Sequence, residues 1–157
     1  MTTTMPEAAA AFLAHKRIAV TGVSRAAKQH GSNTVFRRLR DRGYEVFPVN
    51  PNTDTVEGTR SFHDLSTIPG GVEAVVIATA PDKAEGTMRE CAELGIKHVW
   101  MHRSYGTGSV DPAATAYGRE HGITVIDGGC PLMFDPTADL GHKLMRAIYK
   151  SHVPKNV

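Results

Sequence analysis

The stretch Arg17-Ile18-Ala19-Val20-Thr21-Gly22-Val23-Ser24 decides the fold, together with Gly31-Ser32-Asn33-Thr34, which closes the loop behind it. An apolar run followed by small residues predicts a buried strand, a tight turn and a helix that begins near Thr34. Such a turn leaves room for an anion, and a helix N-terminus directs unpaired N–H groups and a positive dipole end toward it. The stretch suits a phosphorylated ligand, although the same residues also fit a plain strand-to-helix connection.

The turn matches neither of the common phosphate-binding fingerprints. The dinucleotide fingerprint GxGxxG requires a second glycine where this chain has Ser24, and Gly31 follows nine positions after Gly22. The sequence contains no Walker A motif. The turn therefore predicts an anion site without specifying the nucleotide.

Length and composition favour one domain, spanning residues 1–157, in the cytoplasm. A chain of 157 residues buries about 68–70% of the surface that it exposes when unfolded. The net charge of +2 and the lack of a basic block argue against a nucleic-acid partner. Cys91 and Cys130 fit no disulfide framework or metal motif, and no apolar run is long enough to span a membrane. We expect residues 1–5 to be disordered, and we expect no metal and no membrane association.

Apolar runs and helical patterns alternate along the chain. The sequence predicts strands at 17–21, 44–49, 74–79, 97–101 and 123–126. It predicts helices at 6–15, 34–42, 81–94, 112–121 and 137–150, the last packed on the domain through Leu140, Leu144 and Ile148. This alternation predicts an α/β fold, a Rossmann-like doubly wound parallel five-stranded sheet with helices on both faces.

The carboxyl ends of the strands are the expected ligand edge, because doubly wound sheets bind ligands where the strand order reverses. The second strand ends in Asn50-Pro51, not in the acidic residue that binds the ribose of NAD. Asn50 can hydrogen-bond a ribose or an adenine edge, and Pro51 provides a rigid wall. Arg25 and Lys28 either meet additional phosphate charge or are solvated loop charges. Together these features favour an adenine nucleotide with extra phosphates.

Several short motifs form a collective pattern over residues 12–148: residues 18–24, Gly31, Gly43-Tyr44-x-Val46-x-Pro48-Val49-Asn50-Pro51, Gly58, Ile68-Pro69 and Gly95-Ile96-Lys97-x-Val99-Trp100. The pattern resembles the small CoA-binding proteins, which are stand-alone relatives of the CoA-binding domain of the succinyl-CoA synthetase α subunit. The resemblance implies that coenzyme A, or an acyl-CoA, binds through its 3′-phospho-ADP part. It implies phosphate contacts at Gly22, Val23, Ser24, Arg25 and Lys83, and adenosine contacts at Asn50 and Pro51.

The chain departs from that family after its fourth and fifth strands. Relatives usually have a short Gln-x-Gly turn where this sequence has the segment 102–108, and an acidic-basic pair where it has Phe134-Asp135-Pro136. Cys130 is shared with relatives and follows the fifth strand in a Gly-Gly turn. We expect it to be either structural or a candidate redox thiol that forms a mixed disulfide with CoA.

The sequence shows no catalytic constellation, so we expect a protein without an enzymatic activity of its own that senses, carries or presents CoA. One alternative is an NAD(P)-binding oxidoreductase-like protein, with Arg25 and Lys28 on a 2′-phosphate and a substrate near His102 and Tyr105. Another is an interaction module for a synthetase-like partner, which would use the last helix and the surroundings of Trp100. We expect Trp100 itself to lie in the core.

Overall fold

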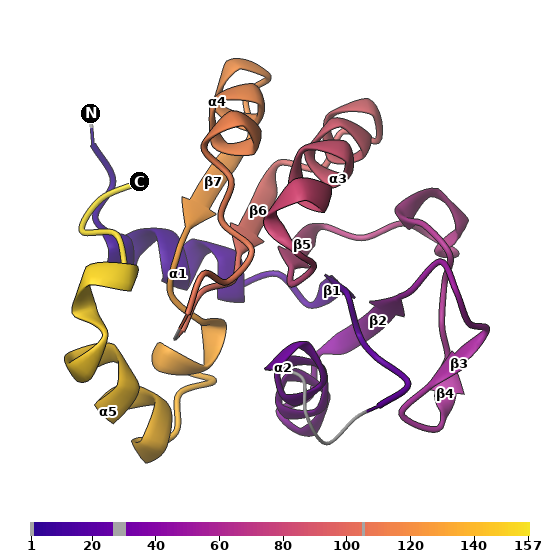
Figure 1. Ribbon diagram of the computed structural model, residues 1–157, viewed down its shortest axis with the longest axis horizontal. Coiled ribbons are helices and arrows are strands. Elements are labelled where there is room, and N and C mark those ends of the chain that lie inside the picture. The colour runs from indigo at the N-terminus through magenta and orange to yellow at the C-terminus, as the bar shows by residue number, and fades with distance from the viewer. Residues whose placement is uncertain (1, 27–30, 105) are drawn as a thin grey trace.

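The computed structural model describes residues 2–26, 31–104 and 106–157 (Figure 1). Its main sheet is parallel throughout, with the strand order β2-β1-β5-β6-β7. These strands are β1 (Arg17–Thr21), β2 (Glu45–Val49), β5 (Ala74–Ile77), β6 (His98–Met101) and β7 (Thr124–Asp127). The α-helices of the described residues are α1 (Met5–Leu13), α2 (Gly31–Asp41), α3 (Pro81–Glu93), α4 (Pro112–Glu120) and α5 (Leu140–Ile148). The predicted Rossmann-like fold is confirmed.

Short elements complete the chain. Strands β3 (Thr55–Val56) and β4 (Thr59–Arg60) form a small antiparallel hairpin after β2. The described residues also form the short 3-10 turns η2 (Leu65–Thr67), η3 (Pro131–Met133) and η4 (Lys150–His152). None of the helices in the described ranges is both long enough and apolar enough to cross a membrane.

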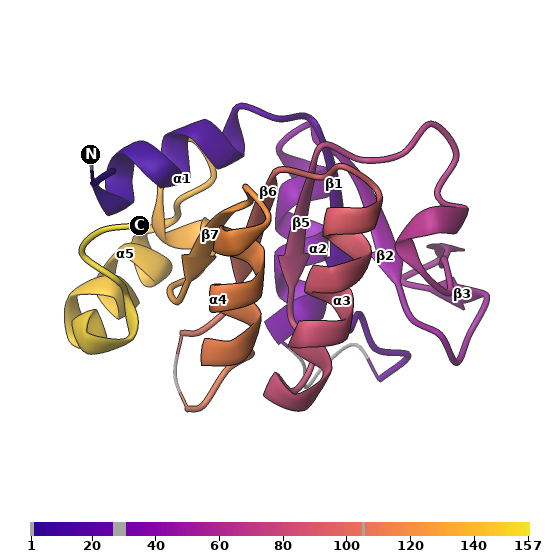
Figure 2. The same ribbon diagram turned by 90° about the horizontal axis from the view of Figure 1, so that it is seen from above.

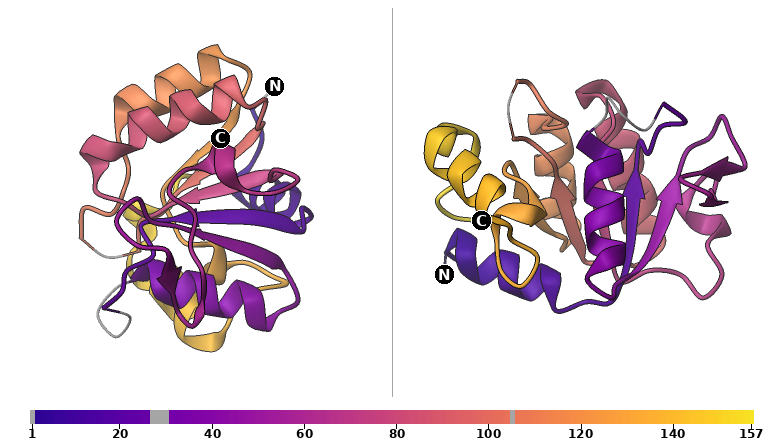
Figure 3. Two further views of the ribbon diagram at one scale, coloured as in Figure 1. Left: turned by 90° about the vertical axis from the view of Figure 1, so that its right-hand side faces the viewer. Right: turned by 90° about the horizontal axis from the view of Figure 1, so that it is seen from below.

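The helices cover both faces of the sheet. Helices α3 and α4 lie on one face and α1 and α2 on the other, as Figures 2 and 3 show from different sides. Apolar side chains fill both layers, so a strand such as β5 is buried on both sides along its whole length. This is why β5 reads as a continuous apolar run in the sequence.

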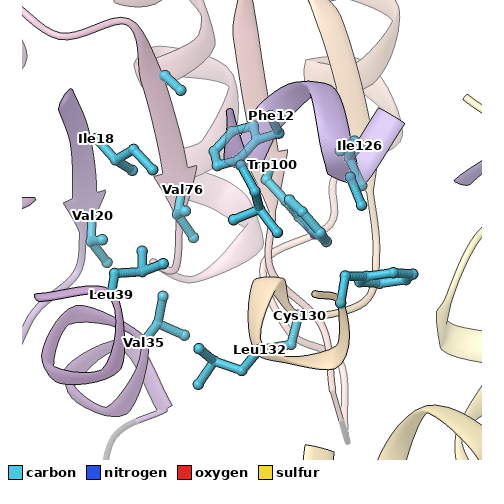
Figure 4. Packing of buried hydrophobic residues seen from close by; sticks show 14 of the residues in the cluster. Phe12, Ile18, Val20, Val35, Leu39, Val76, Trp100, Ile126, Cys130 and Leu132 are labelled. Atoms are coloured by element: carbon cyan, nitrogen blue, oxygen red, sulfur yellow. The ribbon is translucent and has the colours of Figure 1, made fainter. Parts of the chain in front are cut away.

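Trp100 anchors the layer between the sheet and α1 (Figure 4). Its ring is fully buried and lies edge-on to Phe12, with 5.3 Å between the ring centroids, and 5.8 Å from Phe134. Its indole Nε1 donates a hydrogen bond to the Gly128 carbonyl at 2.9 Å, so the buried polar atom has a partner. The prediction that Trp100 belongs to the core is confirmed.

The N-terminal segment differs from the expectation of disorder at Thr4 and Met5. Thr4 caps α1 in a reciprocal arrangement with Glu7, and the side chain of Met5 is buried. The Met5 amide also donates to the carbonyl of Lys155, which ties the start of α1 to the C-terminal segment. Disorder over 1–5 is therefore wrong for these two residues, because a cap and a tertiary hydrogen bond hold them.

Helix α5 begins at Leu140, three residues later than expected, and packs through the opposite face. Leu140, Leu144 and Ile148 are 86%, 60% and 62% exposed, so the expectation that they pack on the domain is wrong. The helix contacts the domain through Met145 and through Arg146, whose Nη1 donates to the Met133 carbonyl at 3.3 Å. The apolar stripe of α5 therefore faces solvent.

Candidate functional site

A cleft opens where the strand order reverses, between the carboxyl ends of β1 and β5. Strand β1 pairs with β2 on one side and with β5 on the other, so the connections that follow β1 and β5 diverge and leave space between them. The cavity there measures about 720 Å³. It is lined by Thr21, Gly22, Val49, Asn50, Pro51, Asn52, His63, Asp64, Leu65, Ala78, Thr79, Ala80, Lys83, Gly86, Thr87 and Glu90.

At Gly22 the connection that follows β1 approaches the connection that follows β5. Its φ is +74°, and a Cβ built on it would lie 2.7 Å from the carbonyl oxygen of Ala78. The Ala78 amide in turn donates to Thr21 Oγ1 at 3.2 Å. Both the backbone conformation and the close approach therefore require glycine at this position.

Two side chains from the first turn of α2 hold the loop that runs from Gly22 to Ser24. Ser32 Oγ donates to the Gly22 carbonyl at 2.8 Å, and Asn33 Nδ2 donates to the Ser24 carbonyl at 2.7 Å. Asn33 Oδ1 also accepts a hydrogen bond from the Ser24 amide at 2.8 Å. The helix that presents these groups begins at Gly31, earlier than the predicted start near Thr34.

Asn50 fixes the same loop from the end of β2. Its Nδ2 donates to the Val23 carbonyl at 2.9 Å, while its Oδ1 accepts from the Asn52 amide at 2.8 Å. The side chain thus joins β2 to the loop, and within the described residues one N–H of its amide group makes no hydrogen bond. Asn50 and Pro51 both line the cavity, where the sequence placed them.

The other predicted site residues divide into two groups. Gly22 and Lys83 line the cavity, and Lys83 lies in the first turn of α3 with its side chain exposed. Val23, Ser24 and Arg25 are described but do not line it: Val23 is buried, Ser24 is half-buried and Arg25 is exposed. Lys28 lies outside the described residues, as does Tyr105.

A second cavity, of about 270 Å³, continues from the first on the β6 side. Both are lined by Ala78, Thr79 and Ala80, and the second is also lined by Gly31, Ser32, His102, Ser104, Gly108 and Ser109. The hydroxyl of Thr79, in the shared wall, is buried without a hydrogen-bond partner among the described residues. A polar ligand spanning the two cavities would offer this hydroxyl a partner, so the cleft suits a long ligand with polar groups along its length.

His102 lines the second cavity, and its pKa is strongly shifted. Its Nε2 lies 3.4 Å from Ser104 Oγ, and burial lowers its pKa to about 4, with the charge of nearby His142 as a smaller cause. The imidazole is therefore neutral at pH 7, so it contributes hydrogen bonding but no charge to the cavity.

Acidification should destabilise the protein through His102. The unfolded side chain binds a proton near pH 6.5 and the folded one only near pH 4, so stability falls as the pH drops through this window. Between pH 7 and pH 4.5 we expect this residue to remove about 2 kcal/mol from the free energy of unfolding. Urea titrations of the wild type and His102→Gln at both pH values measure the difference. Equal losses in the two proteins would contradict the assignment.

Cys130 lies in the core, not at the ligand edge (Figure 4). Its side chain is 1% exposed, and burial raises the pKa of the thiol to about 12. Cys130 directly precedes turn η3. The C-terminal segment covers the residue before it, because the Gly129 amide donates a hydrogen bond to the His152 carbonyl. Of the two alternatives expected for Cys130, burial favours the structural one, because a protonated and buried thiol is a poor nucleophile toward a disulfide.

Two polar side chains that hold the loop were not predicted as site residues. Asn33 is fully buried, and its amide also contacts Glu57 in the tip of the β3–β4 hairpin. From the sequence, Asn33 is expected only as part of the stretch that closes the loop, and no role is expected for Glu57. The signal in the sequence is the Ser32-Asn33 pair directly before the predicted helix, because Ser and Asn favour the ends of helices and hydrogen-bond nearby backbone there.

In the described residues, no three His, Cys, Asp or Glu side chains come together as a metal site would require. Hydrogen-bond donors, the N-terminus of α2 and the Lys83 ammonium lie at the two cavities, and the side chains of His63, Asp64 and Glu90 also line the larger one. The donors, the helix N-terminus and the ammonium bind and orient an anionic ligand.

The fold and the position of the cleft define a Rossmann-like α/β domain, and comparison with known proteins identifies its family. A family model described as a CoA binding domain matches residues 16–136. The chain therefore belongs to the CoA-binding domain family, as its sequence motifs had indicated.

Individual relatives agree with this assignment. The chain is 31% identical over 115 residues to the uncharacterized protein YneT of Bacillus subtilis, covering 73% of this chain and 82% of that protein. It is 34% identical over 150 residues to the α subunit of an ADP-forming acetate–CoA ligase II of Pyrococcus furiosus, covering 90% of this chain and 32% of the subunit. The chain thus spans about a third of that ligase subunit.

A solved structure of similar fold is a hypothetical protein from Pyrococcus horikoshii OT3. It has a TM-score of 0.69 and 26% sequence identity, and the match covers 76% of this chain and 82% of that one. The sheet and its helices are therefore shared with a protein of comparable length.

Proposed function

We propose that this protein binds coenzyme A, or an acyl-CoA, through the 3′-phospho-ADP part, and acts as a sensor or carrier without a catalytic step of its own. The observation that carries the proposal is the 720 Å³ cleft at the switch point, which Gly22 and Lys83 line, together with the adjoining 270 Å³ cavity, which the start of α2 lines through Gly31 and Ser32. This arrangement offers backbone N–H groups, a helix dipole and a cation to phosphates. Membership of the CoA-binding domain family supports the choice of ligand.

The two cavities suggest how the ligand would lie. The larger one, with Asn50 and Pro51, would take the adenosine, and the smaller one, with His102, would take the pantetheine end. The diphosphate would then cross the shared wall near Gly22 and Thr79. No described group in this path forms a nucleophile–base pair with tight hydrogen-bond geometry, since the Ser104–His102 contact is 3.4 Å.

Isothermal titration with CoA, dephospho-CoA, NAD and NADP at one salt concentration tests the proposal. Binding of CoA that weakens without the 3′-phosphate supports it. Binding of NADP without binding of CoA would favour an NAD(P)-binding protein instead. If none of the four ligands binds, nucleotide binding at this cleft is refuted.

A second candidate role is that of an interaction module for a synthetase-like partner chain, and the exposed stripe of α5 favours it. Leu140, Leu144 and Ile148 form a solvent-facing apolar row, and the matched acetate–CoA ligase subunit is about three times as long as this chain. A pull-down with and without CoA, using wild type and Leu144→Glu, tests the role. A synthetase-type chain retained by the wild type alone supports it. Failure to retain such a chain, or equal retention by both proteins, argues against it.

A further inference from the structure

Glu57 lies in the tip of the β3–β4 hairpin, and its carboxylate reaches the first turns of α2. Its Oε1 accepts hydrogen bonds from Asn33 Nδ2 at 3.0 Å and from Arg37 Nη1 at 2.9 Å. The Glu57 side chain is only 8% exposed, while that of Arg37 is 37% exposed. The carboxylate is therefore a buried acceptor whose charge is balanced by the guanidinium.

The contact with Asn33 extends to the loop itself. The Asn33 amide group that donates to Glu57 also donates to the Ser24 carbonyl, and its oxygen accepts from the Ser24 amide. Both polar atoms of the Asn33 side chain are thus hydrogen-bonded, so the side chain cannot rotate without breaking these bonds. A hairpin that follows β2 is joined in this way to a loop that follows β1.

Glu57 holds this position in an unfavourable backbone conformation. Its φ is +51°, the one positive value among the non-glycine residues of the described ranges, and Gly58 follows it in the same region. A glutamate in the left-handed region costs free energy that a glycine avoids. The hydrogen bonds of its carboxylate with Asn33 and Arg37 offset part of that cost.

We infer that Glu57 is a positioning residue for the ligand. By holding Asn33, it keeps the Gly22–Ser24 loop in the shape that leaves the start of α2 open to a phosphate. The expected effect of Glu57 on ligand binding rests on the proposed function. Its expected effect on the shape of the loop rests on the hydrogen bonds alone.

Glu57→Gly separates this role from a purely structural one. Glycine relieves the backbone strain while it removes the carboxylate, so we expect the Tm to change by no more than about 4 °C. The loss of a charge-assisted hydrogen bond should weaken CoA binding about tenfold and speed hydrogen exchange of the Ser24 amide about tenfold. Glu57→Gln keeps an oxygen for Asn33 and should stay within about threefold of the wild type in both measurements.

Glu45→Gln is the matched control, because Glu45 pairs with Arg17 at the opposite ends of the strands and its side chain is 66% exposed. It should leave affinity and Ser24 exchange unchanged. Glu57→Asn, which tolerates the same φ but is one methylene shorter, repeats the measurement if the glycine variant does not fold. Unchanged Ser24 exchange in both shortened variants overturns the inference. Lack of CoA binding by the wild type would refute the proposed function instead, and exchange would still decide whether Glu57 holds the loop.

Discussion

Gly22→Ala should cost the protein about 3 kcal/mol or more of its free energy of unfolding. The new methyl group would lie 2.7 Å from the Ala78 carbonyl oxygen, which belongs to the backbone and does not move aside as a flexible side chain would. The substitution also places alanine at a φ of +74°, which is unfavourable for any residue with a Cβ. The β1 and β5 connections would be forced apart. Urea unfolding followed by circular dichroism measures the loss.

Gly43→Ala is the control for the backbone part of this effect. Gly43 has a φ of +88°, yet a Cβ built on it meets no other atom within 4 Å. We expect this variant to lose only about 1 kcal/mol, the usual cost of a left-handed alanine. The difference between the two variants then isolates the close approach at the switch point. Equal losses would show that the contact with Ala78 is unimportant.

The sheet could be predicted from the sequence because local patterns and the tertiary environment agree there. Strand β1 has the predicted bounds, and the continuous apolar run of β5 follows from its burial on both faces. The start of α2 was misplaced because Gly31 is a weak helix former. Hydrogen bonds from Ser32 and Asn33 to the preceding loop favour the earlier start, and a sequence pattern does not contain them.

The exposure of the α5 stripe and the burial of Cys130 could not be predicted from the sequence for the same physical reason. Leu140, Leu144 and Ile148 show that the helix is amphipathic, but the pattern alone does not show which surface covers the apolar face. Cys130 follows two glycines that suggest an open turn. It is buried because η3 turns inward and residues near His152, more than twenty positions later, cover the turn. Both outcomes depend on contacts between distant segments.

The candidate site was predicted in its location and only partly in its residues. Gly22, Asn50, Pro51 and Lys83 line the cleft because the carboxyl ends of parallel strands share one edge. The segment 102–108 contributes His102, Ser104 and Gly108 to the smaller cavity, as its position after β6 suggested. Asn33 and Glu57 were missed because their importance lies in contacts with each other and with the loop.

Ser24→Asp should weaken CoA binding at least a hundredfold under the proposed function. Ser24 lies in the loop that Asn33 holds beside the start of α2, so a carboxylate there would compete with a ligand phosphate for the same helix N-terminus. Two like charges about 4 Å apart repel by about 4 kcal/mol at an effective dielectric constant of 20, which corresponds to several hundredfold in affinity. Isothermal titration with CoA measures the loss.

Ser24→Asn is the matched control, since asparagine has nearly the shape of aspartate without its charge. The Ser24 hydroxyl accepts a hydrogen bond from the Ala26 amide at 3.0 Å, and either replacement has an oxygen that can accept it, so both variants should fold. We expect the asparagine variant to bind CoA within about tenfold of the wild type. Because the two variants differ chiefly in charge, a large gap between them places the ligand phosphates near this loop. An aspartate variant that folds and binds CoA as tightly as the wild type would place the phosphates elsewhere in the cleft, and Lys83 in the first turn of α3 would then be the next group to substitute.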